Sequence, residues 1–403
     1  MPLATASDAS SSTRTAVPRT GIDLVAAGRG PDLRGLRLGM VTNDVALTTD
    51  FRRGREAVVA AGLDLRLLFT PEHGLTGMAR EGALIGDDVD PVTGLPVRSL
   101  YGDTLAPAAA DLAGLDAVLY DLPDIGARFY TYMWTLSHVL EACAAAGTRL
   151  VVLDRPNPLG GDLAVAEGPM LDEERCHSFV GRWSMPVRHS LTIGELARWW
   201  VRSRGLDVEL DVVAAEGWTR DVTAVDGAAH WTPPSPAMPS ALTALLYPGT
   251  CLLEGVNLSE GRSTAVPFRV LGAPWLDAEA LAGRIRELDL PGLRATPYPF
   301  TPLVRDHAGE PCAGVLLAVT DVAALRPVRS MVRILSLVAE LHGDRLEERT
   351  APHMPGESPR TALEKLFGRV DAFTEITTGA WDDPERFAVP QWAEAVSDSL
   401  LYR

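Results

Sequence analysis

The sequence has little positive charge and no long apolar run, and each absence excludes a class of protein. Its 403 residues carry 37 Lys and Arg against 53 Asp and Glu, which gives a formal charge of −16. Nucleic acids and anionic membrane surfaces attract clustered basic residues, so neither is an expected partner. No run reaches the ~18 apolar residues that a membrane span needs. Residues 1–20 are rich in Ser, Thr and Ala without the apolar core of a signal peptide, so we expect a disordered tail and a cytoplasmic protein.

Cysteine chemistry and the common cofactor motifs are also missing. The four cysteines form no CxxC pair and are too sparse for a disulfide framework. No GxGxxG follows a predicted strand, and there is no P-loop, no GxSxG elbow and no HExxH. We therefore expect no cofactor and no metal. The carboxylates, amides, arginines and aromatic residues that remain are typical of carbohydrate chemistry.

Strand and helix patterns alternate through the first 160 residues. Apolar runs at 36–42, 63–69, 95–100, 115–120 and 149–153 predict strands, with helices expected at 51–61 and 129–146. This alternation predicts an α/β fold with a Rossmann-like parallel sheet. Later patterns predict strands at 207–214 and 314–320 and helices at 193–204, 328–342, 361–369 and 390–401.

A proline-rich segment at 231–239 is either a linker or the rigid wall of a cleft. We place the domain boundary there. The expected division is a Rossmann-like catalytic domain over 21–235 and a smaller α+β domain over 236–403 that contributes to the cleft.

Polar side chains follow four of the predicted strands. Asn43 follows the first, Glu72 and His73 the second, Asp124 the strand at 115–120, and Asp154 the strand at 149–153. The carboxyl ends of parallel strands meet at one edge of a sheet, where ligands bind. The sequence therefore predicts one site built from these strand ends.

Glu72 is the best candidate for a catalytic acid. Phe69 and Pro71 beside it could desolvate the carboxyl group and favour its protonated form. A helix-capping or turn role is the alternative. Glycoside hydrolysis usually needs a second carboxylate, and Asp124 and Asp154 are the candidates.

Further polar and aromatic residues are candidates for binding substrate. Arg128 lies where a helix begins, and a cation there opposes the helix dipole, so either a carboxylate neighbour or an anionic ligand is expected. Tyr130 and Tyr132 either stack on a sugar or pack in the core. The complete set of candidate binding residues is Asn43, His73, Arg128, Tyr130, Tyr132, Arg155, Asn157, Glu254, Asn257, Glu260 and Arg262.

Several of these segments occur in an order that resembles a known family. They are PEHG at 71–74, DIGARFYTY at 124–132, DRPNP at 154–158, PVRH at 186–189, PPSP at 233–236, YPGT at 247–250 and EGVNLSEGR at 254–262. The series, from about Gly21 to the C-terminus, resembles the NamZ (YbbC-like) family of exo-β-N-acetylmuramidases. The chain departs from the family pattern at Pro123, Ser190 and Ser263, which puts fine substrate preference in doubt.

The resemblance implies a Rossmann-like N-terminal domain, a smaller C-terminal domain and a cleft between them. It implies removal of terminal N-acetylmuramic acid from the non-reducing end of peptidoglycan fragments during cell-wall recycling, with the family's catalytic glutamate falling on Glu72. The lactyl carboxylate of that sugar would suit Arg128, Arg155 or Arg262. Its acetamido group would permit substrate-assisted attack, with Asp124 or Asp154 orienting the acetamide.

Two other functions stay open at this point. One is a non-catalytic protein that binds muropeptides or amino sugars. The other is a metal-dependent hydrolase that uses His73, Asp124 and Asp154. In each case the expected partner is a small saccharide, and the sequence does not determine the oligomeric state.

Overall fold

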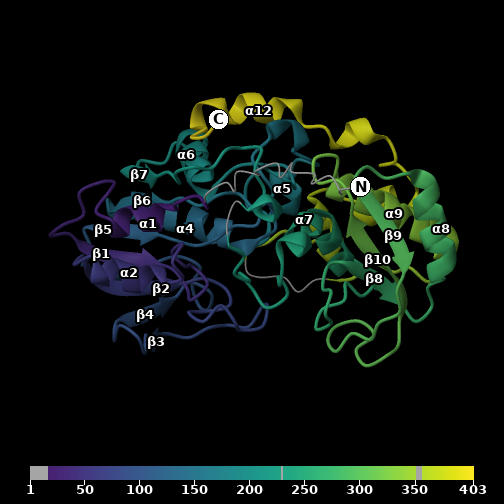
Figure 1. The fold of residues 1–403 in the computed structure, drawn as a ribbon, viewed down its shortest axis with the longest axis horizontal. Helices are drawn as coiled ribbons and strands as arrows, with labels where there is room; N and C mark the ends of the chain where they lie inside the picture. The colour runs from purple at the N-terminus through teal and green to yellow at the C-terminus, as the bar shows by residue number, and fades with distance from the viewer. Residues whose placement is uncertain (1–16, 228–229, 351–355) are drawn as a thin grey trace, which may run out of the picture.

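The computed structural model describes residues 17–227, 230–350 and 356–403, which form two domains side by side (Figure 1). Residues 1–16 of the expected tail lie outside the described residues. Within the rest of that segment, the Arg19 N–H donates to Glu216 O at 2.9 Å. Asp23 Oδ2 accepts the N–H and the hydroxyl of Thr20, each at 2.7 Å, at the start of α1 (Gly21–Ala26). The folded chain therefore begins before residue 21.

The first domain is built on a seven-stranded sheet. Its order is β3 (Asp88–Val89), β4 (Pro96–Ser99), β2 (Asp64–Thr70), β1 (Arg37–Val41), β5 (Ala117–Tyr120), β6 (Arg149–Leu153) and β7 (Leu210–Val213). Every neighbouring pair is parallel except β3 and β4. The predicted α/β fold is thus confirmed. The chain leaves β1 for β2 on one side and later returns to β5 on the other, so a topological switch point lies beside β1, where such sheets bind ligands.

Helices cover both faces of this sheet. One face carries α1 and α2 (Gly54–Ala60), which pack over an apolar cluster that includes Ile22, Met40 and Val58. Parallel strands with both faces covered are apolar throughout. This is why the strands were recognisable as continuous apolar runs.

The other face carries the helices that bring the motifs to the sheet edge. These are α3 (Ala109–Leu112), α4 (Thr131–Ala146) and α6 (Ile193–Arg204). A short helix, α5 (Glu173–Cys176), lies between β6 and α6 in the sequence. A capping box starts α6, because Thr192 Oγ1 accepts the Glu195 N–H and Glu195 Oε2 accepts the Thr192 N–H.

The second domain is smaller and holds an antiparallel sheet. Its strands lie in the order β8 (Val270–Ala273), β10 (Ala313–Val319) and β9 (Leu293–Pro297), with α7 (Ala241–Thr250), α8 (Ala278–Leu288), α9 (Pro327–His342), α10 (Ala362–Phe367) and α11 (Ala372–Thr377). Gly249 of the YPGT motif allows α7 to lie against the start of α9. A Cβ there would be 2.1 Å from Pro327 O.

The C-terminal segment returns to the first domain. Helix α12 (Pro390–Val396) packs against the first domain near residues 163–165, and the chain ends near α6 (Figure 1). Arg198 and Arg202 of α6 donate to carbonyl oxygens of residues 395, 398 and 400. We infer that the unit expected over 21–235 is completed by residues 390–403. In the described part of the chain, no helix is long and apolar enough to cross a membrane.

Candidate active site

A cavity of about 690 Å³ lies between the two domains, with Glu72 on its wall. The first domain contributes the segments that follow β2 and β4, the start of α4 and residues 235–238. The second domain contributes parts of α7 and α10, the loop at 254–268 and Arg305. Pockets that bind small molecules have volumes of about 300–1,000 Å³. The cavity therefore has room for a sugar.

Two hydrogen-bond donors from different segments hold the Glu72 carboxyl group. Glu72 Oε1 accepts the Gly82 N–H at 2.8 Å, and Oε2 accepts the Thr131 hydroxyl at 2.8 Å. The residue follows β2 and is 7% exposed. Tyr101 lies on the same wall, and burial, followed by the charge and hydrogen bond of Glu72, raises the pKa of its phenol. Glu72 thus presents a buried carboxyl group, held in one orientation, at the wall of the cavity.

His73 also lines the cavity. Its backbone is left-handed, with φ of 70°, and its Nδ1 lies 2.7 Å from Ala79 O. A carbonyl can only accept, so Nδ1 carries a proton and the neutral ring keeps Nε2 as an acceptor. His73 can therefore accept a hydrogen bond from a substrate hydroxyl.

An aromatic wall faces the same space. Phe129, Tyr130, Tyr247 and Phe268 line it and meet edge to face, with ring centroids 4.8–6.3 Å apart. Tyr132 does not line the cavity. Its hydroxyl accepts the Asn43 amide at 3.1 Å and donates to Pro234 O at 2.8 Å. Of the two predicted tyrosines, Tyr130 lines the cavity. Tyr132 and Asn43 do not line it and are hydrogen-bonded to each other.

A cluster of charges occupies the second-domain side. Arg262 lies 2.6 Å from Glu254, 2.8 Å from Glu260 and 3.7 Å from Glu81. Arg305 lies 2.8 Å from Glu254 and 3.2 Å from Glu81. Burial opposes ionisation of Glu254, but the two guanidinium groups outweigh it and lower the pKa. Burial and the charge of Glu254 raise the pKa of Glu260. The predicted loop at 254–262 therefore does reach the cavity.

Sequence reasoning missed several cavity residues. Thr131 lies inside the segment 124–132, and its place at the start of a predicted helix was an available signal. Tyr101 directly follows the expected strand at 95–100, so its position was a further signal. The other missed polar residues are Glu81, Ser235, Arg305, Arg349, Thr350, Glu357 and Lys365. They come from loops or from α10, and no spacing marks them.

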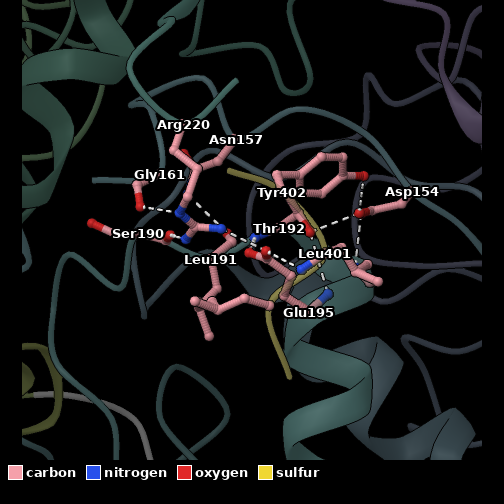
Figure 2. Close-up of polar contacts among 12 residues, drawn as sticks. Asp154, Asn157, Gly161, Ser190, Leu191, Thr192, Glu195, Arg220, Leu401 and Tyr402 are labelled. Atoms are coloured by element: carbon pink, nitrogen blue, oxygen red, sulfur yellow. Dashed lines mark hydrogen bonds and ion pairs between the residues drawn. The ribbon is translucent and has the colours of Figure 1, made fainter. Parts of the chain in front are cut away.

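Asp154 does not line this cavity. Its carboxylate meets Thr192 and Tyr402 (Figure 2). It is fully buried, and its Oδ2 accepts the hydroxyls of Thr192 at 2.7 Å and Tyr402 at 2.6 Å. Its Oδ1 accepts the N–H of Gly194 at 2.8 Å. Burial raises its pKa to about 6 despite these donors. Asp154 thus ties β6 to the start of α6 and to the C-terminus.

Asp124 and Arg155 line a second, smaller cavity of about 100 Å³ at the switch point beside β1. Asp124 Oδ2 accepts the Gly126 N–H at 2.9 Å and lies 3.3 Å from His189 Nε2. Arg155 pairs with the buried Asp121 at 2.7 Å. Pro234 lines this cavity, whereas Ser235 and Pro236 line the larger one. The proline-rich segment separates the two cavities, which agrees with its interpretation as a rigid wall.

Arg128 is buried among backbone carbonyls. It donates to the carbonyl oxygens of Pro169, Met185 and Leu366 at 2.8–2.9 Å, and burial lowers its pKa to about 9. Neither a carboxylate nor an anionic ligand is needed to explain its position.

Two predicted amides also serve the fold. Asn157 donates to Leu191 O at 2.8 Å, and Asn257 donates to Arg345 O at 2.9 Å while accepting the Glu347 N–H. Neither lines the cavity that holds Glu72. Among the described residues, no three His, Cys, Asp or Glu side chains lie together in a way that could hold a metal ion.

Comparison with known families accounts for almost the whole chain. Residues 38–242 match the model described as "Exo-beta-N-acetylmuramidase NamZ, N-terminal", and residues 245–398 match its C-terminal counterpart. The chain belongs to the NamZ family. The resemblance seen in the sequence is confirmed.

Relatives agree in sequence and in fold. The peptidoglycan β-N-acetylmuramidase NamZ of Bacillus subtilis (strain 168) is 37% identical over 331 residues, which cover 82% of this chain and 79% of that protein. Two crystal structures of DUF1343 family proteins from Bacteroides fragilis NCTC 9343 superpose with TM-scores of 0.84 and 0.72, at 28% and 24% identity. Each match covers 96% of this chain and 99% of the other, and the second shows the fold alone. The two-domain architecture is therefore that of the NamZ family.

Proposed function

We propose that this protein is an exo-β-N-acetylmuramidase in which Glu72 is the general acid. It would release terminal N-acetylmuramic acid from the non-reducing end of peptidoglycan fragments. The observation that carries the proposal is the buried Glu72 carboxyl group, held by two donors on the wall of a sugar-sized cavity in a NamZ-family chain.

The hydrogen bonds assign the acid proton to one oxygen. A backbone N–H only donates, so the contact from Gly82 keeps Oε1 an acceptor in both protonation states. The Thr131 hydroxyl at Oε2 can rotate and accept instead. These two contacts favour Oε2 as the oxygen that carries the proton to the leaving group.

The cavity supports substrate assistance opposite Glu72. Among the described residues, the three other carboxylates on its wall each have a cationic partner: Glu81 with Arg305, Glu254 with Arg262, and Glu357 with Lys365. In the substrate-assisted route the acetamido oxygen attacks C1, the C1–O bond breaks, and Glu72 protonates the leaving oxygen. Water then opens the oxazolinium ring at C1, with the Glu72 carboxylate taking its proton. Asp124 and Asp154 would then have structural roles.

Arg262 and Arg305 are the candidates for binding the lactyl carboxylate. Of the three arginines predicted for that role, only Arg262 lines the cavity. Arg305 uses Nε and Nη1 for Glu81 and Glu254, and in the described chain Nη2 makes no hydrogen bond. A substrate carboxylate at Nη2 would complete its pairing.

A disaccharide and an activated aryl glycoside together test the acid. Glu72→Gln should reduce kcat on N-acetylmuramyl-β-1,4-N-acetylglucosamine by about 10²–10⁴-fold. The loss should be smaller on the 4-nitrophenyl β-N-acetylmuramide, whose leaving group needs less protonation. Glu279→Gln, an exposed glutamate in the first turn of α8, is the matched control. An inert wild type would favour the binding-protein alternative, and normal turnover by Glu72→Gln would refute the assignment.

Two further measurements separate the remaining mechanisms. Replacing the acetamido group of the aryl substrate by trifluoroacetamido weakens its carbonyl nucleophile, so kcat should fall steeply if that group attacks C1. Activity should survive a chelator, whereas a metal-dependent hydrolase would lose it.

A cytoplasmic role in cell-wall recycling remains a prediction. It is supported by family resemblance and by the composition of the chain. Immunoblotting of cell fractions would test the location.

A further inference from the structure

The loop that follows β2 carries two neighbouring residues with different tasks. Gly82 donates its N–H to Glu72 Oε1 at 2.8 Å. Its φ of 71° is left-handed, a conformation that favours glycine. Glu81, directly before it, points to the second domain, where it meets Arg305 at 3.2 Å and Arg262 at 3.7 Å.

The loop is tied at Ala79, whose N–H donates to His73 O, and at Ile85, whose N–H donates to Tyr101 O, and few other contacts hold the residues between them. No helix or strand lies between β2 and β3, and no residue from 78 to 89 is buried. Met78 and Leu84 are 64% and 70% exposed. The Glu81 ion pairs are therefore a main restraint on the position of the Gly82 N–H.

Glu81 is held as an anion. Burial opposes its ionisation, but the charges of Arg262 and Arg305 outweigh burial and lower its pKa. Arg305 is itself oriented by Glu254 at 2.8 Å. The restraint thus runs from the second domain through Arg305 and Glu81 to Gly82 and Glu72.

We propose that Glu81 is a positioning residue: its pairing with Arg305 and Arg262 across the cleft places the Gly82 N–H on Glu72. The inference rests on the proposed function. Through it, the acid geometry of Glu72 depends on contact between the two domains. The competing possibility is that Glu81 itself reacts with substrate.

The two possibilities predict different pH profiles. An N–H donor stabilises a carboxylate more than the neutral acid, because hydrogen bonds to charged groups are stronger. Loss of the Gly82 donor should therefore move the basic limb of the kcat profile to higher pH. The other titratable groups that face Glu72 are Tyr101, Tyr130, Tyr132 and His73. Among the described residues, Glu81 pairs with Arg305 and Arg262 and not with any of these four.

The experiment compares Glu81→Gln, Arg305→Gln and the double variant on the disaccharide. We expect Glu81→Gln to lower kcat about tenfold with little change in KM, and to move the basic limb upward by about one pH unit. The double variant should cost no more kcat than Arg305→Gln alone, because both remove one link. Asp88→Asn, which changes an exposed carboxylate in β3 where the same loop ends, should match wild type.

The dependence of kcat on ionic strength is a second readout, and it can be measured on the wild type without any substitution. Raising salt weakens a partly exposed ion pair, so kcat of the wild type should fall while kcat of Glu81→Gln stays level. Unchanged kcat, pH profile and salt response in Glu81→Gln would overturn the inference. A loss above about 10⁴-fold with no shifted limb would make Glu81 a reacting group. If Glu72→Gln were fully active, the proposed function would fail instead, so the two failures are distinguishable.

Discussion

Thr131 Oγ1 lies 2.8 Å from Glu72 Oε2, which joins the first residue of α4 to the end of β2. The two residues are 59 positions apart, and the sheet brings them together because β2 and β5 both end at the edge where α4 begins. The contact orients the oxygen that we assign to the acid proton.

Removal of this hydroxyl should slow the reaction without weakening substrate binding. We expect Thr131→Val, which keeps the shape of the side chain, to lower kcat on the disaccharide about tenfold, since the lost bond is worth roughly 1.5 kcal/mol. Thr131→Ser keeps the hydroxyl and should recover most of the rate. Equal kcat in both variants would show that the hydroxyl does not act on Glu72.

The sequence predicted the sheet well because its strands are buried on both faces. β1, β2, β4, β5 and β6 each fall within or next to an expected apolar run. The capping box of α6 fixed the start of that helix to the residue. Helices α1, α3, α5, α7, α8 and α11 were not predicted. The residues of α7 are mostly apolar and buried on all sides, so they show no amphipathic pattern.

The site was predictable where it follows a strand or lies in one of the segments that resemble the family, as Tyr130 and Arg262 do. Glu72 and His73 line the cavity, but Asp154 follows a strand in the same way and serves the fold. Residue type and strand position do not distinguish the two. The difference is that the hydroxyls of Tyr402 and Thr192, which are distant from Asp154 in the sequence, donate hydrogen bonds to its carboxylate. Arg305 and Lys365 reach the cavity only through tertiary packing, which leaves no local signature.

Arg262 should be essential for stability as well as for binding. Its side chain is 12% exposed and is the closest cation to Glu260, which is buried, and to Glu254, which is partly buried. Arg262→Met removes the ion-pair partner of Glu260 and leaves Glu254 with Arg305 alone, so we expect a loss of about 3–5 kcal/mol in the free energy of unfolding near pH 8. The loss should shrink toward pH 5, where the acids can protonate. Arg284→Met, in an exposed ion pair with Glu340, is the control, with an expected loss below about 1 kcal/mol. A loss from Arg262→Met that did not change with pH would point to lost packing rather than charge.

The raised pKa of Asp154 predicts that its contribution to the free energy of unfolding decreases as pH rises. Its folded pKa is raised to about 6 from the ordinary 3.8, so the folded state binds the proton more tightly than the unfolded chain. Its contribution therefore falls as pH rises from about 4 to 6 and stays low above that range.

Tyr402→Phe removes a donor that the Asp154 carboxylate uses and also the acceptor for the Ala215 N–H. We expect a loss of about 2–3 kcal/mol at pH 8 and a smaller loss at pH 4, where Asp154 is neutral. Denaturant unfolding of both proteins at the two pH values measures the difference. A larger loss at pH 4 than at pH 8 would contradict the role given to Tyr402.

Lys365 is the only lysine in the sequence, and it lines the cavity, where it pairs with Glu357 at 2.6 Å. An amine-selective acylating reagent therefore has one side-chain amine as its target, and that amine lies in the candidate site, 5% exposed. We expect acylation at alkaline pH to inactivate the enzyme in step with the mass added to Lys365. N-acetylmuramic acid should slow both events more than N-acetylglucosamine does, because only the former carries the lactyl carboxylate. Lys365→Arg keeps the positive charge beside Glu357 and offers no amine, so its remaining activity should resist the reagent. Acylation of Lys365 without loss of activity would mean that substrate does not occupy this part of the cavity. The substrate site would then be smaller than the cleft between the domains.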